Sequence, residues 1–353
     1  MITVLATIFV LGVLIFIHEL GHFIMAKRAG IKVEKFSLGF PPAILSKKVG
    51  ETEYCIGLIP LGGFVKMAGE NPNEEATGSA YEFMSKSISV RAAVVFAGPF
   101  MNFILAWFIL WGIYVYQGEP IIDPDHAIIG YISPDGPAAK AGLTEGDIVT
   151  AINGTPVAGF HEMAGLISAE PAKEIVVSWQ REGREMNATI LTHSEEAYND
   201  QGAKVPAGRI GVGQQVTYKS LNIFSAAWKG LTKAAEFVAM VFQFVYNLIT
   251  MKISAKMVGG PVFIAQMAGQ TAQAGFSALL FFMSMLSVNL AVLNVLPIPV
   301  LDGGHLVFLL IEKLKGKPLT MHQRVVAQQV GMVFLLLVIV LVTYNDIVRF
   351  VSG

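Results

Sequence analysis

Charge is what this sequence has least of. Asp, Glu, Lys and Arg make up only 14% of its 353 residues, against about 25% in soluble globular proteins. The formal net charge is −1, so there is no basic surplus with which to bind nucleic acid, and we exclude that class of partner. The single cysteine, Cys55, excludes an internal disulfide. Hydrophobic residues reach 54%, above the roughly 45–50% of soluble proteins, and this excess points to a membrane protein.

The hydrophobic residues gather in four long stretches, each with at most one charged residue. These are residues 1–26, 92–118, 276–311 and 325–345. About 20 apolar residues are enough to cross the hydrocarbon core of a bilayer as a helix. We therefore predict a polytopic α-helical membrane protein with four transmembrane helices. A secretory signal peptide is the alternative for the first stretch, but neither a basic n-region nor a small-residue cleavage site precedes Lys27.

Lysine and arginine in the short loops predict the orientation. Residues 27–48 and 313–324 are rich in both, whereas residues 119–125 carry only acidic charges. Because cytoplasmic loops are enriched in lysine and arginine, we expect both termini and the central region to be extracytoplasmic. A further apolar segment, Phe237–Met251, is short, and its polar residues fall on one stripe, which predicts an amphipathic helix on the membrane and not a fifth span.

Two histidines and a glutamate interrupt the first apolar stretch, in the sequence HELGH. His18 and His22 are four residues apart, so both rings project from the same face of a helix. This H-E-x-x-H pattern is the one in which two histidines bind Zn²⁺ and the glutamate is the general base for a water molecule. The pattern predicts His18 and His22 as metal ligands and Glu19 as the catalytic base. The alternative is that Lys27 and Arg28 end the span early and leave these residues at the membrane interface.

A catalytic zinc needs a third protein ligand and an open position for water. Asp302 is the only charged residue in the third stretch, and Pro297 and Pro299 break the helix just before it. Irregular backbone at membrane depth is tolerated where it is buried or lines a cavity, so a carboxylate at this break predicts a site. Asp302 is the candidate third ligand, with His305 as a rival. Two histidines and an aspartate also suit iron or cobalt.

Together these motifs resemble the site-2 protease family of intramembrane zinc metalloproteases, in its bacterial RseP type. The motifs are HELGH in the first span and N-x-x-P-x-P-x-L-D-G-G, which begins at Asn294, in the third. Further matching stretches are GLIPLGGFVKMAGE (57–70), SKSISVRAAVVFAGPFMN (85–102) and GGPVFIAQMAG (259–269). The resemblance covers essentially the whole chain. It implies one Zn²⁺ held by His18, His22 and Asp302, and an active site in the cytoplasmic half of a bacterial inner membrane.

The resemblance also implies a membrane-re-entrant β-hairpin at about residues 54–67, whose edge receives the unwound substrate as an added strand. The candidate substrate-binding residues are Gly62, Gly63 and Phe64 at the hairpin and Asn294 and Pro297 beside the cleft. An ordinary cytosolic hairpin is the alternative reading of this segment. For Asn294, and for Asn102 in the second span, helix packing is the alternative.

Residues 127–215 lose the apolar character and resemble a bacterial PDZ domain, an α+β module inserted between the second and third spans. We expect its helix at residues 160–168, strands at 174–180, 185–191 and 209–212, and a polar loop at 194–207. PDZ domains capture extended peptides along a sheet edge, and Ile210, Gly211 and Val212 are the candidate contacts. The alternative is a domain that only shields the active site.

The sequence therefore predicts an intramembrane zinc metalloprotease that performs regulated proteolysis of single-span membrane proteins. The resemblance implies substrates of the anti-sigma factor type, first trimmed by a site-1 protease, with remnant signal peptides as a second class. A catalytically inactive membrane adaptor that binds peptide termini through its PDZ domain is the alternative. Loss of the glutamate or of a metal ligand would indicate such an adaptor, and all four residues are present.

Overall fold

The structure is a computed structural model that describes residues 1–70, 77–198 and 204–351. The chain divides into two compact units. The first, which we call the helical unit, comprises Met1–Tyr114, Ile223–Ile249 and Val258–Gly353. The second, the β unit, comprises Val115–Asn222 and Thr250–Met257.

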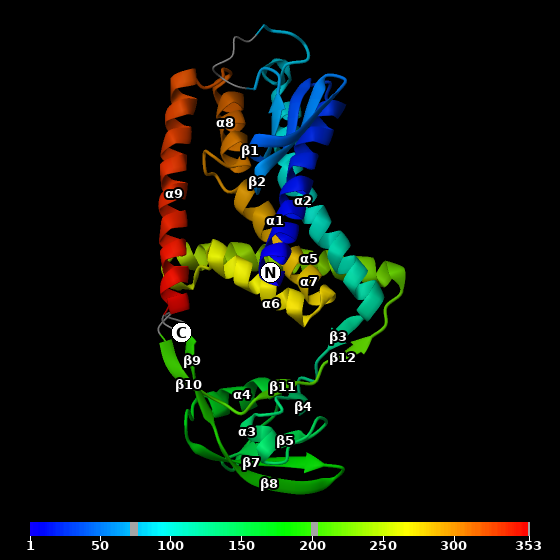
Figure 1. Cartoon of the computed structure of the whole chain (residues 1–353), viewed down its shortest axis with the longest axis vertical. Coiled ribbons are helices and arrows are strands. Elements are labelled where there is room, and N and C mark those ends of the chain that lie inside the picture. Colours follow the sequence, from blue (N-terminus) through cyan, green and yellow to red (C-terminus); the bar gives the residue numbers. More distant parts are fainter. Residues whose placement is uncertain (71–76, 199–203, 352–353) are drawn as a thin grey trace. The chain divides into compact units, whose positions relative to one another are not determined.

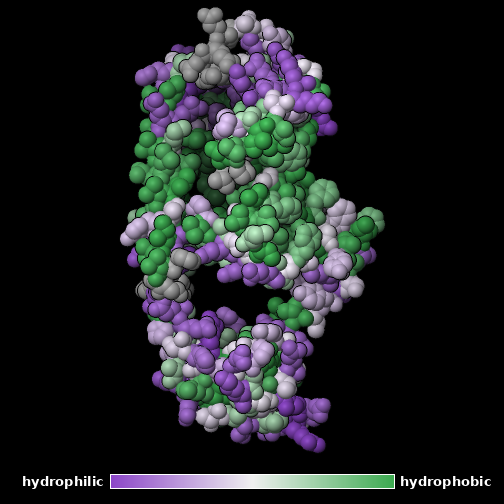
Figure 2. Space-filling model, in the orientation of Figure 1, coloured by the Kyte–Doolittle hydropathy of each residue, from purple (hydrophilic) through white to green (hydrophobic). Residues whose placement is uncertain are grey.

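Among the described residues, four helices are long and apolar enough to span a membrane. They are α1 (Ile2–Arg28), α2 (Ile88–Gln117), α7 (Phe276–Val295) and α9 (Met321–Val351). Each overlaps one of the apolar stretches predicted from the sequence. Along α9, large apolar side chains such as Leu337 and Val340 are about two-thirds exposed, and Figure 2 shows the hydrophobic surface that they form over this helix. A helix that exposes apolar residues all round suits lipid and not water.

Two further helices, α5 (Ile223–Ile249) and α6 (Pro261–Ala274), run across the others in Figure 1. The segment predicted to be amphipathic lies largely in α5, which buries Ala226 and Ala234 and exposes Trp228. The start of α6 is fixed by α9, because the carboxylate of Asp346 accepts hydrogen bonds from the backbone N–H groups of Gly260 and Phe263, both at 2.9 Å. This contact satisfies amides that a helix N-terminus leaves unpaired.

The two long strands β1 (Val33–Val49) and β2 (Thr52–Met67) pair with each other in one sheet. Residues 35–38 of β1 pair with residues 63–66 on one side and with residues 53–56 on the other. The prediction of a hairpin within residues 54–67 is therefore wrong, because the two halves of β2 lie on opposite sides of β1. The chain turns back at Gly39 (φ +90°), a conformation that glycine adopts without strain.

The third predicted span is broken, as the two prolines indicate. α7 ends at Val295, and α8 (Asp302–Lys315) begins a new helix after an irregular turn. A Cβ atom on Gly303 would collide with the backbone carbonyls of Val295 and Leu296, and one on Gly304 with that of Ile298. These glycines let the turn fold tightly against the first residues of α8, so that Asp302 has a defined position.

The β unit holds an antiparallel sheet with the strand order β11-β4-β5-β7-β8 and with β6 paired to β5. Its elements are β3 (Glu119–Ile121), β4 (Ala127–Ile132), α3 (Pro137–Lys140), β5 (Ile148–Ile152), β6 (Thr155–Pro156), α4 (Phe160–Ser168), β7 (Glu174–Arg181), β8 (Arg184–Leu191), β11 (Val212–Gln214) and β12 (Thr217–Lys219). Met163 and Ile167 of α4 pack with Trp179 of β7 in one buried core. Helix α4 and strands β7 and β8 lie where the sequence predicts them.

Two parts of the β unit differ from the prediction. The expected polar loop 194–207 instead contains strands β9 (His193–Tyr198) and β10 (Lys204–Arg209), which pair with each other; residues 199–203 lie outside the described residues. Opposite charges face one another across this ladder, with Lys204 2.5 Å from Glu196, and such cross-strand pairs stabilise a polar hairpin. The returning strand predicted at 209–212 begins only at Val212.

Candidate active site

Helices α1 and α8 bring the three predicted metal ligands together. The Nε2 atoms of His18 and His22 are 3.2 Å apart, and Oδ2 of Asp302 lies 3.1 Å from the first and 3.6 Å from the second. Ligand atoms about 2.0–2.1 Å from a tetrahedral Zn²⁺ lie roughly 3.3 Å from one another. Oδ2 of Asp302 is also buried without a hydrogen-bond donor. The three atoms therefore fit three corners of a zinc site, with the Oδ2 atom of Asp302 as one of them.

Helix α2 orients both imidazole rings from behind. Nδ1 of His22 lies 2.9 Å from the backbone carbonyl oxygen of Val94, and Nδ1 of His18 lies 3.2 Å from the side-chain amide of Asn102. His22 can donate its Nδ1 proton to the Val94 carbonyl, which keeps its Nε2 free for a metal, the usual arrangement for a histidine ligand. The contact of His18 is with the amide nitrogen of Asn102, which is a donor. Asn102 is fully buried, and its backbone oxygen accepts a hydrogen bond from Ser287 of α7. It therefore both packs helices together and faces a candidate ligand.

Glycines allow α1 and α2 to approach each other closely at this point. A Cβ atom on Gly98 of α2 would collide with the imidazoles of His22 and His18, and one on Gly21 of α1 with the carbonyl of Ala97. Any larger residue at position 98 would displace the rings. Gly98 lies in the stretch SKSISVRAAVVFAGPFMN, where a small residue in an apolar helix is a known sign of close helix packing.

A cavity of about 640 Å³ opens onto the three ligand atoms. Glu19, Phe64 and Asn294 line it, as does His305, which is not part of the ligand triangle. The backbone of Gly63 lies against Glu19, since a Cβ atom there would be 3.0 Å from Glu19 Cγ. The cavity leaves room for the water molecule and the substrate that a catalytic metal site must admit.

Two of the predicted substrate residues lie elsewhere. Pro297 is exposed in the turn before α8 and is not among the residues that line the cavity. Gly62 is likewise outside the lining, and it packs on the ring of Phe40, with no space for a Cβ atom. Pro297 thus belongs to the turn between α7 and α8, and Gly62 to the packing of β2 against Phe40.

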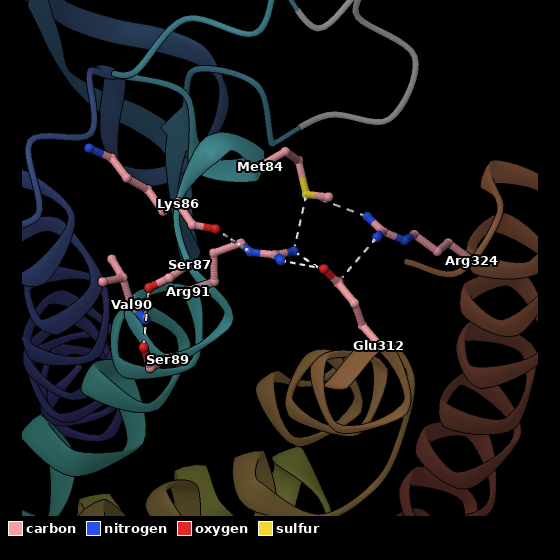
Figure 3. Close-up of polar contacts among 8 residues, drawn as sticks. All are labelled: Met84, Lys86, Ser87, Ser89, Val90, Arg91, Glu312 and Arg324. Atoms are coloured by element: carbon pink, nitrogen blue, oxygen red, sulfur yellow. Dashed lines mark hydrogen bonds and ion pairs between the residues drawn. The ribbon is translucent and has the colours of Figure 1, made fainter. Parts of the chain in front are cut away.

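The cavity wall also contains charged residues that the sequence did not single out. Glu70 follows β2, and burial raises the pKa of its carboxyl from 4.5 to about 7, against the opposing hydrogen bond from the backbone N–H of Met67. Arg91, Glu312 and Arg324 form a second group on the wall, drawn in Figure 3. Arg91 lies far in the chain from Glu312 and Arg324, so no local sequence pattern identifies this group.

The β unit has a cavity of its own, of about 400 Å³. Ile210, Gly211 and Val212, the candidate peptide contacts, line it, and so do Phe160 and Met163 of α4. β11 is the edge strand of the sheet, so its outer side is open to pairing. An edge strand beside an apolar groove is suited to an added peptide strand.

Comparisons with known proteins agree with this geometry. The model of peptidase family M50 matches residues 6–338. The zinc metalloprotease RasP of Oceanobacillus iheyensis is 32% identical over 99% of both chains. The regulator of sigma-W protease RasP of Bacillus subtilis is 32% identical over 98% of both. A putative zinc metalloprotease of Agrobacterium fabrum is 35% identical over 96% of this chain and 94% of that protein.

Among solved structures, a PDZ domain from Listeria monocytogenes is similar to 27% of this chain and covers 92% of its own, with 20% identity and a TM-score of 0.21. The sequence comparisons extend over both units, including the spans that carry HELGH and the broken third helix. The chain therefore belongs to peptidase family M50, the site-2 protease family, and is a zinc metalloendopeptidase.

Proposed function

We propose that this enzyme cleaves single-span membrane proteins within the membrane, with Zn²⁺ held by His18, His22 and Asp302 and with Glu19 as the general base. The ligand triangle carries the proposal, since its edges of 3.1–3.6 Å match a tetrahedral ion. Ionisable residues in a transmembrane helix are costly and by default imply a function. Helices α1 and α7 are both long and apolar enough to span a membrane.

Zinc at this site supplies a Lewis acid and makes water a better nucleophile at neutral pH. Glu19 lines the same cavity, where it takes a proton from the attacking water and passes it to the nitrogen of the leaving peptide. Val94 and Asn102 hold the two imidazoles by their Nδ1 atoms throughout. The chain's own residues thus supply proton transfer and fixed ligand orientation.

The edge of the β1–β2 sheet is the proposed substrate platform. Residues 63–66 pair with β1 on one side, and Phe64, Val65 and Lys66 line the cavity. A substrate that unwinds to pair with this edge exposes a backbone carbonyl to attack, which a helix would keep hydrogen-bonded. Asn294 also lines the cavity, where its side-chain amide can hydrogen-bond the substrate backbone.

The substrate class is proposed from a relative's name and from the β unit. The Bacillus subtilis protein is named a regulator of sigma-W protease, which supports anti-sigma factors trimmed by a site-1 protease, with remnant signal peptides as a second class. The β unit is the proposed PDZ domain, which receives peptide ends along β11 on the extracytoplasmic side. The basic loops after the first and third spans support this orientation in a bacterial inner membrane.

The test is cleavage of a tagged single-span model substrate by the purified protein in detergent. Wild type is compared with Glu19→Gln at matched zinc content. We expect cleavage by wild type and a loss of roughly 10²–10⁴-fold in the variant, the range for general acid–base catalysis. Equal cleavage by both proteins would contradict the assignment of Glu19, whereas no cleavage by either with zinc bound would contradict the substrate class.

A further inference from the structure

An ion cluster far from the ligand triangle lies in the wall of the same cavity. Arg91 of α2 donates two hydrogen bonds to the carboxylate of Glu312 of α8, at 3.0 and 2.5 Å, and a third from Nε to the carbonyl oxygen of Lys86 at 3.1 Å. Arg91 is 4% exposed and Glu312 is 8% exposed. Figure 3 shows the planar fork of Arg91 facing Glu312, with Arg324 of α9 on the opposite side of the carboxylate.

The two arginines of this cluster do not contact Glu312 equally closely. Arg324 approaches Glu312 only to 4.0 Å, which is beyond hydrogen-bond distance. Met84 lies between the two guanidinium groups, 3.8 Å from Arg91 and 3.6 Å from Arg324. The firm link is therefore the one between Arg91 and Glu312, which joins the start of α2 to the far end of α8.

Stability alone is a weak reason for such a pair. Removing two charges from water costs several kcal/mol per ion, and apolar side chains of similar volume often stabilise a protein equally well or better. What an arginine–carboxylate fork adds is a fixed distance and direction between two elements. The pair of Arg91 and Glu312 therefore fixes the distance and direction between α2 and α8.

Helix α8 carries Asp302 at its first position and Glu312 ten residues later, about 15 Å along the axis. Its start follows an irregular turn, so α7 alone does not determine the direction of α8. Arg91 fixes the far end to α2, and α2 also holds His22 through Val94 and His18 through Asn102. Helix α2 therefore positions all three candidate ligands. It contacts the two histidines directly and positions Asp302 through α8.

We propose that Arg91 and Glu312 are positioning residues of the metal site, which hold Asp302 in register with the two histidines. The inference rests on the proposed ligand set, and it concerns how that set is kept in place. Metal sites require ligand distances within about 0.2 Å of their ideal values, so a small tilt of α8 is enough to weaken binding. Arg324 is only loosely connected to this link.

The test measures zinc affinity by competition with a chelator, and the visible spectrum of the cobalt-substituted protein, in detergent. Changes behind metal ligands typically weaken binding about 10- to 100-fold, and we expect this for Glu312→Gln, with an altered cobalt spectrum. We expect Arg324→Gln to change the affinity less than about threefold, because its contact with Glu312 is long. The matched control is Asp147→Asn, which breaks a bidentate pair between the buried Asp147 and the partly exposed Arg181 in the β unit and is expected to leave zinc affinity unchanged.

The double variant Arg91→Met with Glu312→Leu separates positioning from stability. It removes both charges of the Arg91–Glu312 pair and leaves only the partly exposed Arg324 without a carboxylate. We therefore expect the melting temperature to recover in part relative to Glu312→Gln, while zinc binding stays at least about tenfold weaker. Zinc affinity within twofold of wild type in both Glu312 variants would overturn the inference. An equal loss of affinity in Asp147→Asn would also overturn it, because the effect would then be general. Zinc bound tightly by wild type without substrate cleavage would instead count against the proposed substrate class alone.

Discussion

Each unit contains an aspartate with a buried carboxylate oxygen, and the two carboxylates have different partners. In the β unit, Asp147 is 1% exposed, and its two oxygens accept hydrogen bonds from Arg181 at 2.7 and 2.8 Å and from the backbone N–H of Thr144 at 2.8 Å. In the helical unit, Asp302 faces two imidazole nitrogens, and its Oδ2 atom has no hydrogen-bond donor.

The difference separates a structural carboxylate from a functional one. Buried polar groups are normally hydrogen-bonded, and an exception needs an explanation such as an ion or a catalytic role. Asp147 is complete without a ligand, so it holds β5 to the end of β7. The Oδ2 atom of Asp302 instead lies beside two imidazole nitrogens, a position that suits a ligand of a shared cation.

The largest effect on zinc affinity is expected from removing the carboxylate of Asp302. Asp302→Ala deletes a candidate ligand, and we expect zinc affinity to fall by more than the roughly 10- to 100-fold typical of changes behind ligands. Metal analysis after gel filtration measures the zinc content. His305→Ala is the control, since His305 lines the cavity outside the triangle. Zinc retained in Asp302→Ala but lost in His305→Ala would transfer the role of third ligand to His305.

A smaller effect is expected from a single methyl group behind the ligands. Gly98→Ala places a Cβ atom against both imidazoles, and we expect zinc affinity to fall about 10- to 100-fold. Gly112→Ala in the same helix is the matched control, because nothing lies within 4 Å of its Cβ position. There, alanine is expected to stabilise slightly. If both variants bind zinc like wild type, the close contact between α1 and α2 does not constrain the site.

The smallest effect concerns pH and has opposite signs in the two units. Burial raises the pKa of Glu70 to about 7, so its contribution to stability is present below its ordinary value of 4.5 and is lost as the pH rises through about 7. For Asp147, burial acts to raise the pKa, but the bonds from Arg181 and Thr144 outweigh it and lower the pKa below 3.8. Its contribution is therefore present above pH 3.8 and is lost as the pH falls further.

These opposite signs are measurable as differences in melting temperature between wild type and Glu70→Gln or Asp147→Asn, with a chelator present. As the pH rises from 5 to 8, the melting temperature of wild type should fall relative to that of Glu70→Gln. The fall should be about 2–4 °C for each kcal/mol of unfolding free energy that is lost. Relative to Asp147→Asn, wild type should lose stability only in acid. A pH-independent difference for Glu70→Gln would mean that this carboxyl is not buried in solution.

Local patterns in the sequence predicted much of the candidate site. The spacing of His18 and His22 fixes a shared helix face, and the prolines before Asp302 predict the break between α7 and α8, which the structure confirms. Helix α4 was also predictable with its observed bounds, because a local run of apolar and turn residues determines it. The roles of these residues in metal binding and catalysis stay predictions.

Contacts between distant segments were not predictable. The pairing of β2 on both sides of β1 depends on the bend at Gly39 and on where each half finds a free edge, and residues 54–67 alone suggest an ordinary hairpin. Strands β9 and β10 are polar and depend on paired charges rather than on apolar alternation. Arg91 and Glu312 are 221 residues apart, so only the folded chain shows that they meet.

The most direct test of the central claim is X-ray absorption spectroscopy at the zinc edge of the purified, zinc-loaded protein, combined with its zinc-to-protein ratio. The account predicts one zinc per chain in a first shell of nitrogen and oxygen atoms at about 2.0–2.1 Å, with two imidazoles that disappear in a variant lacking His18 and His22. A sulfur ligand from Cys55, or an unchanged zinc shell in that variant, would contradict it.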